Sequence, residues 1–159
     1  MSKALGQSQS FIGIDLGTST GFARCDKARR AIFTSQTWDL KPTRFDSPAM
    51  RYVKFKTRLR EQLALGATLV FYEKVMRHMG TAAAHAYGAF LFSLHETCDD
   101  YAVPYLGLTV QEIKMFATGK GNAKKDAMMA AALKWGFKPS SEDEADAIAI
   151  LKCGMETKI

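Results

Sequence analysis

The chain has 159 residues, 47% of them hydrophobic, which suffices for one domain with a buried core and is too few for two full domains. Its 22 Lys and Arg residues outnumber its 16 Asp and Glu residues, and this excess favours an anionic partner, nucleic acid before membrane. Three widely spaced cysteines without a CxxC pair suggest neither a disulfide framework nor a thiolate zinc site.

We expect a soluble protein of the cytoplasm, with no membrane partner. No apolar run reaches membrane-spanning length, and the N-terminal stretch lacks the apolar core of a signal peptide. Residues 1–9 are expected to be a flexible N-terminus, and residues 10–155 a single domain.

The first predicted elements are three strands. The run Phe11–Leu16 has no polar face and only one charge, Asp15, so it is predicted to be a central strand covered on both sides. Two further strands, Thr20–Cys25 and Ala31–Trp38, are separated by a charged turn and indicate an antiparallel meander.

A helix is predicted next, with Ser47 as its cap, Pro48 as its first residue and an end near Gly66. Its buried side is expected to consist of Met50, Val53, Leu59 and Leu63. Another face carries three basic residues, Arg51, Lys54 and Arg58. The sequence leaves open whether this face is only solvated or follows a phosphate backbone.

The middle of the chain alternates strands with helices. The apolar strand Leu69–Tyr72 ends on Glu73, as the first strand ends near Asp15. An Ala-rich helix follows over Gly80–Cys98, and its small residues permit close packing in the core or across a dimer, of which we expect core packing. The remaining predicted elements are a strand over Tyr101–Leu108 and helices over Val110–Ala117, Asn122–Trp135 and the segment after Ser141. This order predicts an α/β fold.

The three histidines lie around the Ala-rich helix. They are His78, His85 and His95. No carboxylate joins them at the spacing of metal ligands, so we interpret them as structural residues and assign them no metal.

The last helix contains an acid that its start does not explain. Ser141 and Glu144 are predicted to form a capping box, and acids in the first turn suit the helix dipole. Asp146 is instead surrounded by apolar residues. Asp143 lies three positions earlier and therefore shares its face, which should point at the sheet.

Four acids on two strands and this helix could thus meet: Asp15, Glu73, Asp143 and Asp146. Such carboxylates repel one another unless cations compensate them. An all-carboxylate set favours Mg²⁺ or Mn²⁺, and two such ions would support phosphodiester hydrolysis. The alternative for Asp15 is a turn former ahead of Gly17 that accepts backbone hydrogen bonds.

The segments GIDLG, YEKV and DEADAIAI carry these acids and resemble the RuvC-type Holliday-junction resolvases, particularly their phage and prophage branch. The resemblance covers most of Phe11–Cys153. It implies a ribonuclease-H-like mixed sheet, with an antiparallel meander and parallel strands, flanked by helices. It further implies a homodimer that nicks four-way DNA junctions with Mg²⁺ or Mn²⁺ in recombination and repair. The catalytic and metal-binding acids would be Asp15, Glu73, Asp143 and Asp146.

The segment IKMFATGKGNAKKD is similar to the family's basic residues around a Gly-rich turn. The resemblance places Lys114 and Lys125 at the phosphate-contacting positions, with Lys124 as a substitute for Lys125 and Lys120 as a further DNA contact. Lysines beside a metal pair can offset the charge that develops on the scissile phosphate. The segment is not a Walker loop, because Gly follows Lys120, so no nucleotide cofactor is implied.

Met76 and Arg77 follow the YEKV segment, where the bacterial branch of the family has an aromatic residue that wedges into the junction. Methionine stacks on bases less specifically than an aromatic ring. We therefore expect DNA contacts at Met76 and Arg77 and action on other branched DNA, including forks and three-way junctions.

Two other functions compete with a nuclease. GIDLGTSTG also resembles the first phosphate loop of actin-like and sugar-kinase ATPases, although these clamp nucleotide between two domains and do not need the pair Asp143 and Asp146. A non-cleaving module that binds branched DNA is the third reading. The intact acids favour the nuclease.

Overall fold

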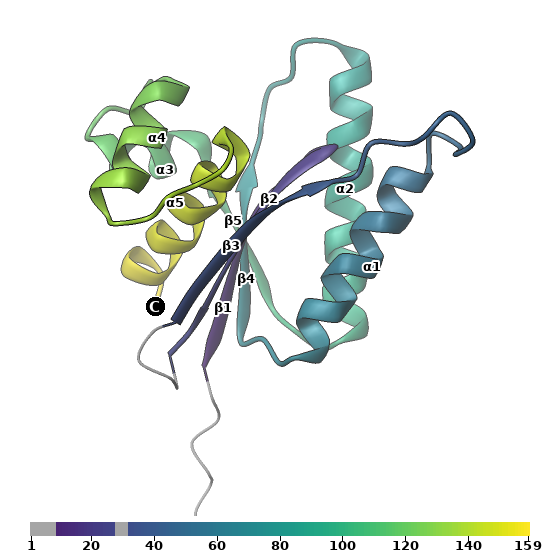
Figure 1. Ribbon diagram of the computed structural model, residues 1–159, viewed down its shortest axis with the longest axis horizontal. Coiled ribbons are helices and arrows are strands. Elements are labelled where there is room, and N and C mark those ends of the chain that lie inside the picture. Colours follow the sequence, from purple (N-terminus) through teal and green to yellow (C-terminus); the bar gives the residue numbers. More distant parts are fainter. Residues whose placement is uncertain (1–8, 28–31) are drawn as a thin grey trace, which may run out of the picture.

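The computed structural model describes residues 9–27 and 32–159. These residues form one five-stranded sheet flanked by helices (Figure 1). The strands are β1 (Ser10–Asp15), β2 (Ser19–Asp26), β3 (Ile32–Asp39), β4 (Leu69–Lys74) and β5 (Tyr105–Thr109). The helices are α1 (Met50–Ala64), α2 (Thr81–Asp100), α3 (Val110–Thr118), α4 (Lys125–Lys134) and α5 (Glu142–Thr157).

The sheet has the order β3-β2-β1-β4-β5, with β1 at its centre. β2 pairs with β1 and β3 in antiparallel fashion, whereas β4 runs parallel to both β1 and β5. The predicted meander, the central first strand and the mixed α/β sheet are therefore confirmed. Part of the predicted charged turn, residues 28–31, lies outside the described residues, as do residues 1–8.

Helices cover both faces of the sheet, and each face has its own core. In Figure 1, α1 and α2 lie on one side of the sheet and α3, α4 and α5 on the other. The first core includes Ile12, Ile14, Trp38, Phe55 and Phe90, and the second includes Phe11, Phe71, Leu108, Ile148 and Leu151. Side chains of β1 alternate between the two cores, which explains why this strand has no polar face.

α1 begins later than predicted and buries a different face. Its N-cap is Ala49, which makes no side-chain cap, so the predicted cap at Ser47 is wrong. Residues 47–50 form a turn closed by a hydrogen bond from the Met50 amide to the Ser47 carbonyl. Leu59 and Leu63 are buried as expected, but Phe55 takes the place predicted for Val53, which is 51% exposed. The larger aromatic ring buries more apolar surface.

α2 packs into the core through its C-terminal half, where Phe90, Leu94 and Cys98 are buried. The expectation that its small residues pack in the core is wrong for Ala82 and Gly88, which are exposed. His95 stacks on Tyr105 at a centroid distance of 4.3 Å, an aromatic packing contact. No helix in the described part of the chain has the length and apolar character that a membrane crossing requires.

α5 lies unusually close to the sheet because glycines face it. A Cβ atom at Gly13 of β1 would lie 2.7 Å from the Ala147 carbonyl oxygen. A Cβ atom at Gly154 of α5 would lie 2.5 Å from the Phe71 ring. Glycine is thus required on both sides of this contact, which places the start of α5 over the ends of the central strands.

Candidate active site

Asp15 and Glu73 lie beside each other at the ends of two parallel neighbours. Ile14 of β1 is in register with Tyr72 of β4, so the next residue of each strand is one of the two acids. Parallel strands end at the same edge of a sheet, which is where open α/β sheets commonly place their ligands. The pattern of an apolar strand that ends on an acid occurs twice in the sequence, and the two acids belong to the same site.

The first turn of α5 brings two more acids to this edge. Its N-cap is Ser141, whose Oγ accepts a hydrogen bond of 3.0 Å from the Glu144 amide. The predicted capping box is only half formed, because the Glu144 carboxylate accepts from Ser140 and Ser35 instead of reaching back to Ser141. Asp143 and Asp146 remain on the helix face that points at the sheet edge.

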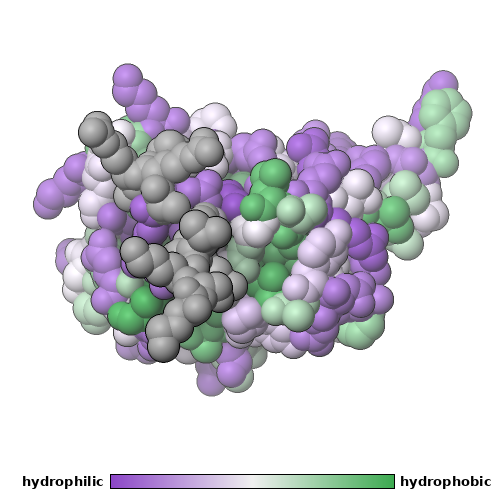
Figure 2. Space-filling view, turned by 90° about the horizontal axis from the view of Figure 1, so that it is seen from below, coloured by the Kyte–Doolittle hydropathy of each residue, from purple (hydrophilic) through white to green (hydrophobic). Residues whose placement is uncertain are grey.

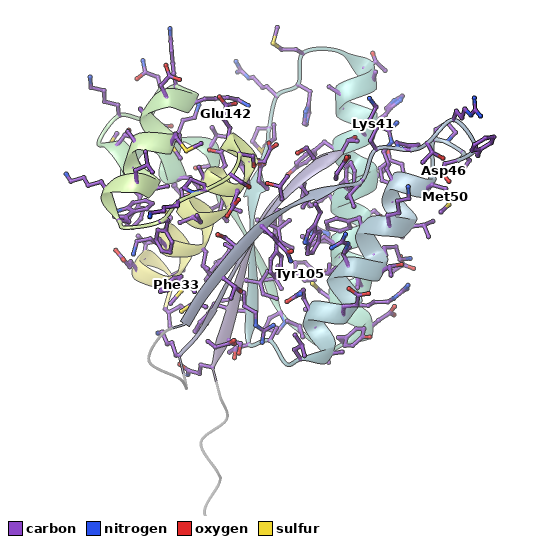
Figure 3. The ribbon with its side chains drawn as sticks, viewed as in Figure 1. Phe33, Lys41, Asp46, Met50, Tyr105 and Glu142 are labelled. Atoms are coloured by element: carbon purple, nitrogen blue, oxygen red, sulfur yellow. The ribbon has the colours of Figure 1, made fainter. Side chains whose placement is uncertain are left out.

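A cavity of about 340 Å³ joins these acids. It is lined by all four predicted carboxylates and by the two predicted phosphate-contacting lysines, together with apolar and small residues: Asp15, Glu73, Asp143, Asp146, Lys114, Lys125, Leu16, Gly17, Ser19, Val110, Ile113, Met128 and Ile150. The acids come from β1, β4 and α5, and the lysines from α3 and α4. Figure 3 labels Glu142, the first residue of α5, which forms an ion pair with Lys125 of α4.

Burial raises the pKa values of three acids in the cavity, Asp15, Glu73 and Asp146. Burial, reinforced by the charges of Glu73, Asp146 and Asp143, raises the pKa of Asp15 well above its usual value. Burial and the Asp146 charge raise the pKa of Glu73 to about 7. Burial is also the main reason that the pKa of Asp146 rises to about 6. Crowded, partly buried acids of this kind are typical of functional sites.

Lys114 and Lys125 partly offset the carboxylate charge. Both act against the upward shift in the pKa of Glu73 and of Asp146. Lys125 also forms an ion pair of 3.1 Å with Glu142, in which both side chains are at least half exposed. An exposed pair of this kind contributes little to stability, so Lys125 can exchange Glu142 for another anion.

Ser19 is a cavity residue that the sequence analysis missed. It begins β2, and its hydroxyl donates a hydrogen bond of 2.7 Å to Oδ2 of Asp143. The same strand touches the α5 backbone, since a Cβ atom at Gly21 would lie 1.8 Å from the Asp143 carbonyl oxygen. A glycine inside a strand was the available signal for this close approach.

The cavity suits hard divalent cations by its chemistry. Its lining offers carboxylates and no imidazole or thiol, the ligand set that Mg²⁺ and Mn²⁺ prefer. Within residues 9–27 and 32–159, no three His, Cys, Asp or Glu side chains converge into a formed metal-binding group. The carboxylates share one cavity without the close geometry of a loaded site.

The other predicted DNA contacts lie outside this cavity. Lys124 is the N-cap of α4, and Lys120 lies in the preceding loop. Both are exposed and absent from the cavity lining, which contains Lys125. Met76, which is 72% exposed, and Arg77 line a neighbouring hollow of about 400 Å³. The two hollows share Val110.

A scan against protein-family models and a search of curated proteins found no match. Among solved structures, the chain is similar to Thermus thermophilus RuvC in complex with a Holliday junction substrate. The TM-score is 0.77, the identity is 20%, and the match covers 92% of this chain and 93% of that chain. A second T. thermophilus RuvC structure gives a TM-score of 0.73 with the same identity and coverage.

These likenesses show that the chain has the RuvC fold. The predicted ribonuclease-H-like architecture is therefore confirmed. The resemblance to the phage and prophage branch stays a prediction.

Proposed function

We propose that this protein is a metal-dependent endonuclease that nicks four-way DNA junctions and other branched DNA. One observation carries the proposal: four carboxylates and two lysines from five different elements line a single cavity at the strand ends of a RuvC fold. Burial and mutual repulsion raise the pKa values of Asp15, Glu73 and Asp146, and packing alone gives no reason to bury them together. A cation-binding site gives that reason.

The substrate class follows from two independent features. The similar T. thermophilus RuvC was solved in complex with a Holliday junction substrate. The net charge of +6 favours a polyanion, and DNA affinity should therefore fall steeply with salt as counterions are released from phosphates. Exposed Met76 in place of an aromatic wedge favours activity on forks and three-way junctions as well.

Asp15, Glu73, Asp143 and Asp146 are the residues that would hold Mg²⁺ or Mn²⁺, with two ions in each site. Such ions supply activation of a water and stabilisation of the leaving oxygen in phosphodiester hydrolysis. Metal binding would require ionised carboxylates, so Asp15, Glu73 and Asp146, whose pKa values are raised, would release protons as the ions bind.

Lys114 and Lys125 would bind and orient the scissile phosphate. Both line the cavity, Lys114 from α3 and Lys125 from α4. Their ammonium groups would offset the charge that develops on the phosphate oxygens. Lys125 would leave its exposed partner Glu142 in doing so, a change with a small cost.

We further propose a single nuclease domain over residues 10–155 that acts as a homodimer in the cytoplasm. Paired nicks on a symmetric junction require two symmetric sites. The N-terminal half of α2 is the surface we favour for this contact, because its small residues are exposed and Phe92 nearby is 67% exposed. No nucleotide cofactor is part of the proposal.

The experiment is a nicking assay on labelled four-way, three-way and linear DNA in Mg²⁺, with the wild type and Asp15→Asn. Paired nicks at the four-way junction that the variant loses support a resolvase. Equal cutting of three-way and four-way DNA would make the protein a general branch nuclease. Tight junction binding without cutting would identify a non-cleaving module and overturn the proposal.

A further inference from the structure

The positive charge of the chain is concentrated in one segment. Residues 41–60 contain seven of the 22 Lys and Arg residues and only one of the 16 Asp and Glu residues, Asp46. The rest of the chain holds fifteen basic and fifteen acidic residues, so its formal charges balance. The net charge of +6 therefore comes from the loop between β3 and α1 and from α1 itself.

The loop between β3 and α1 ends in an ordered turn. Asp46 accepts a hydrogen bond of 2.8 Å from the Thr43 amide, and its Oδ2 lies 3.0 Å from Nζ of Lys54. The Asp46 amide in turn donates to the Thr43 carbonyl. These contacts lower the pKa of Asp46. Figure 1 shows the loop between β3 and α1 projecting from one end of the molecule, and Figure 3 labels Asp46 on it.

The turn presents an aromatic ring and a guanidinium group to solvent. Phe45 is 83% exposed, and the Arg44 guanidinium carbon lies 4.5 Å from the centroid of its ring. The ring is thus covered by Arg44 and otherwise open. In Figure 2, the same end of the molecule carries a projection on which hydrophilic and hydrophobic surface lie together.

This projection is connected directly to the loop of the candidate active site. The Leu40 amide donates to the Thr18 carbonyl, and Nη1 of Arg51 donates to Oγ1 of Thr18 at 3.1 Å. Thr18 lies between Gly17 and Ser19, which both line the carboxylate cavity. β3 also runs parallel to β1 through β2, so the loop leaves the sheet at the edge where Asp15 lies.

We infer that Arg44 and Phe45, with the basic residues of the same loop and of α1, form a second DNA contact beyond the cleavage site. The cations would bind backbone phosphates of one arm. The open face of Phe45 would stack on an unpaired base or on the terminal pair at a branch. The inference takes DNA as the partner from the proposed function.

Two plainer explanations fit the observations less well. A single exposed apolar residue needs no explanation on its own, but Phe45 is fixed at the tip of an ordered turn within the segment that supplies the entire net charge. A second copy of this chain would have to meet the same excess of positive charge, and one ring is far smaller than a stable protein interface. DNA matches both the charge and the open ring.

The test compares binding of a four-way junction in EDTA by the wild type and by Phe45→Ala, so that no cleavage intervenes. The control is Leu65→Ala, since Leu65 is 72% exposed at the other end of α1. We expect Phe45→Ala to weaken binding about tenfold, as loss of one stacked base does. The control should change binding less than about twofold. Thermal unfolding checks that both variants remain folded.

A second pair of variants tests the charge. Arg44→Gln should lower the slope of log affinity against log salt by about one. It should also weaken the proposed contact between the Phe45 ring and DNA, because Arg44 lies against that ring. The control is Lys138→Gln, an exposed position outside the segment, which should leave the slope unchanged. Nicking at saturating DNA should stay within about twofold of the wild type for the two controls, Leu65→Ala and Lys138→Gln.

Unchanged junction binding by Phe45→Ala would overturn the inference, as would an equal loss in Leu65→Ala. A change of oligomeric state in Phe45→Ala would assign the turn to a second copy and overturn it too. The two proposals can fail independently. If the wild type never nicks but its junction binding depends on Phe45, only the nuclease proposal is rejected. Nicking with binding independent of Phe45 rejects only the DNA contact.

Discussion

The Ser19 hydroxyl donates a hydrogen bond of 2.7 Å to Oδ2 of Asp143, a residue 124 positions further along the chain. It ties the start of β2 to the first turn of α5. The bond occupies one carboxylate oxygen and orients the other. Ser19 is therefore a positioning residue for an acid that we propose as a metal ligand, because groups that orient ligands affect metal affinity.

Replacing Ser19 with Ala should weaken Mn²⁺ binding by about tenfold, the low end for such a partner because the hydrogen bond is exposed. Free Mn²⁺ counted by electron paramagnetic resonance measures this without any cleavage. Ser19→Thr keeps the hydroxyl and should recover most of the affinity. Equal affinities in Ser19→Ala and the wild type would show that Asp143 needs no such support.

Gly21→Ala should destabilise the protein by about 3 kcal/mol or more. Its Cβ atom would lie 1.8 Å from the Asp143 carbonyl oxygen, a distance that only a backbone shift relieves. Urea unfolding measures the loss. Gly88→Ala is the control, since a Cβ atom there meets no atom within 4 Å and alanine favours a helix by about 1 kcal/mol. Equal stability of Gly21→Ala and Gly88→Ala would contradict the close contact between Gly21 and the Asp143 carbonyl.

Glu73→Gln should stabilise the metal-free protein at pH 8. Burial raises the pKa of Glu73 from 4.5 to about 7, so between these values the folded state binds more protons than the unfolded state. The free energy of unfolding therefore falls as pH rises through this window. The destabilisation by Glu73 is complete above pH 7 and absent below pH 4.5. At pH 8, the free energy of unfolding of Glu73→Gln should therefore exceed that of the wild type by roughly 2–3 kcal/mol.

Urea unfolding in EDTA at pH 5.5 and pH 8 tests this. The wild type should lose stability between the two values, and Glu73→Gln should lose less. The raised pKa values of Asp15 and Asp146 act in the same direction, so the variant keeps part of the slope. Parallel pH profiles for the two proteins would show that Glu73 ionises freely in the folded state.

The sequence predicts that acids stand at the ends of two apolar strands because this signal is local. An apolar run that ends on an acid occurs at Asp15 and again at Glu73, and parallel pairing makes those acids neighbours. Asp146 stands out within an apolar helix. Pattern and charge suffice for the α/β class and for selecting the acids of the cavity, whereas the ribonuclease-H-like arrangement is implied by the family resemblance.

The missed features depend on contacts between distant segments. Glu144 completes a capping box by its spacing, yet its carboxylate binds Ser35, 109 positions away, and Ser140. Ser19 looks like an ordinary turn residue until α5 is placed over it. Phe45 gives no signal, because the role that we propose for it depends on a turn that Asp46 and Lys54 order across eight positions.

Arg24→Met should destabilise the protein by about 3 kcal/mol. Arg24 is 6% exposed and donates to the carbonyls of Gln62 and Gly66 at the end of α1. Removing the guanidinium group leaves those carbonyls without this donor and removes the ion pair with Asp26. Urea unfolding measures the loss, and Arg24→Lys should recover only part of it because an ammonium lacks the forked donors.

Nicking per folded molecule should be unchanged in Arg24→Met. Arg24 is in register with Ile12, away from the strand end that carries Asp15. If Arg24→Met nicks far more slowly than the wild type under conditions where it is fully folded, Arg24 affects the site as well as stability, which would contradict this prediction.

The central claim is that the four acids form a metal-dependent nuclease site. Nicking of a labelled four-way junction in Mg²⁺ by Asp146→Asn tests it most directly, with Glu156→Gln, an exposed acid on the same helix, as the control. We predict that Asp146→Asn lowers the rate at least 100-fold while junction binding in EDTA persists, and that Glu156→Gln nicks like the wild type. Unchanged Mg²⁺-dependent nicking by Asp146→Asn would contradict the account.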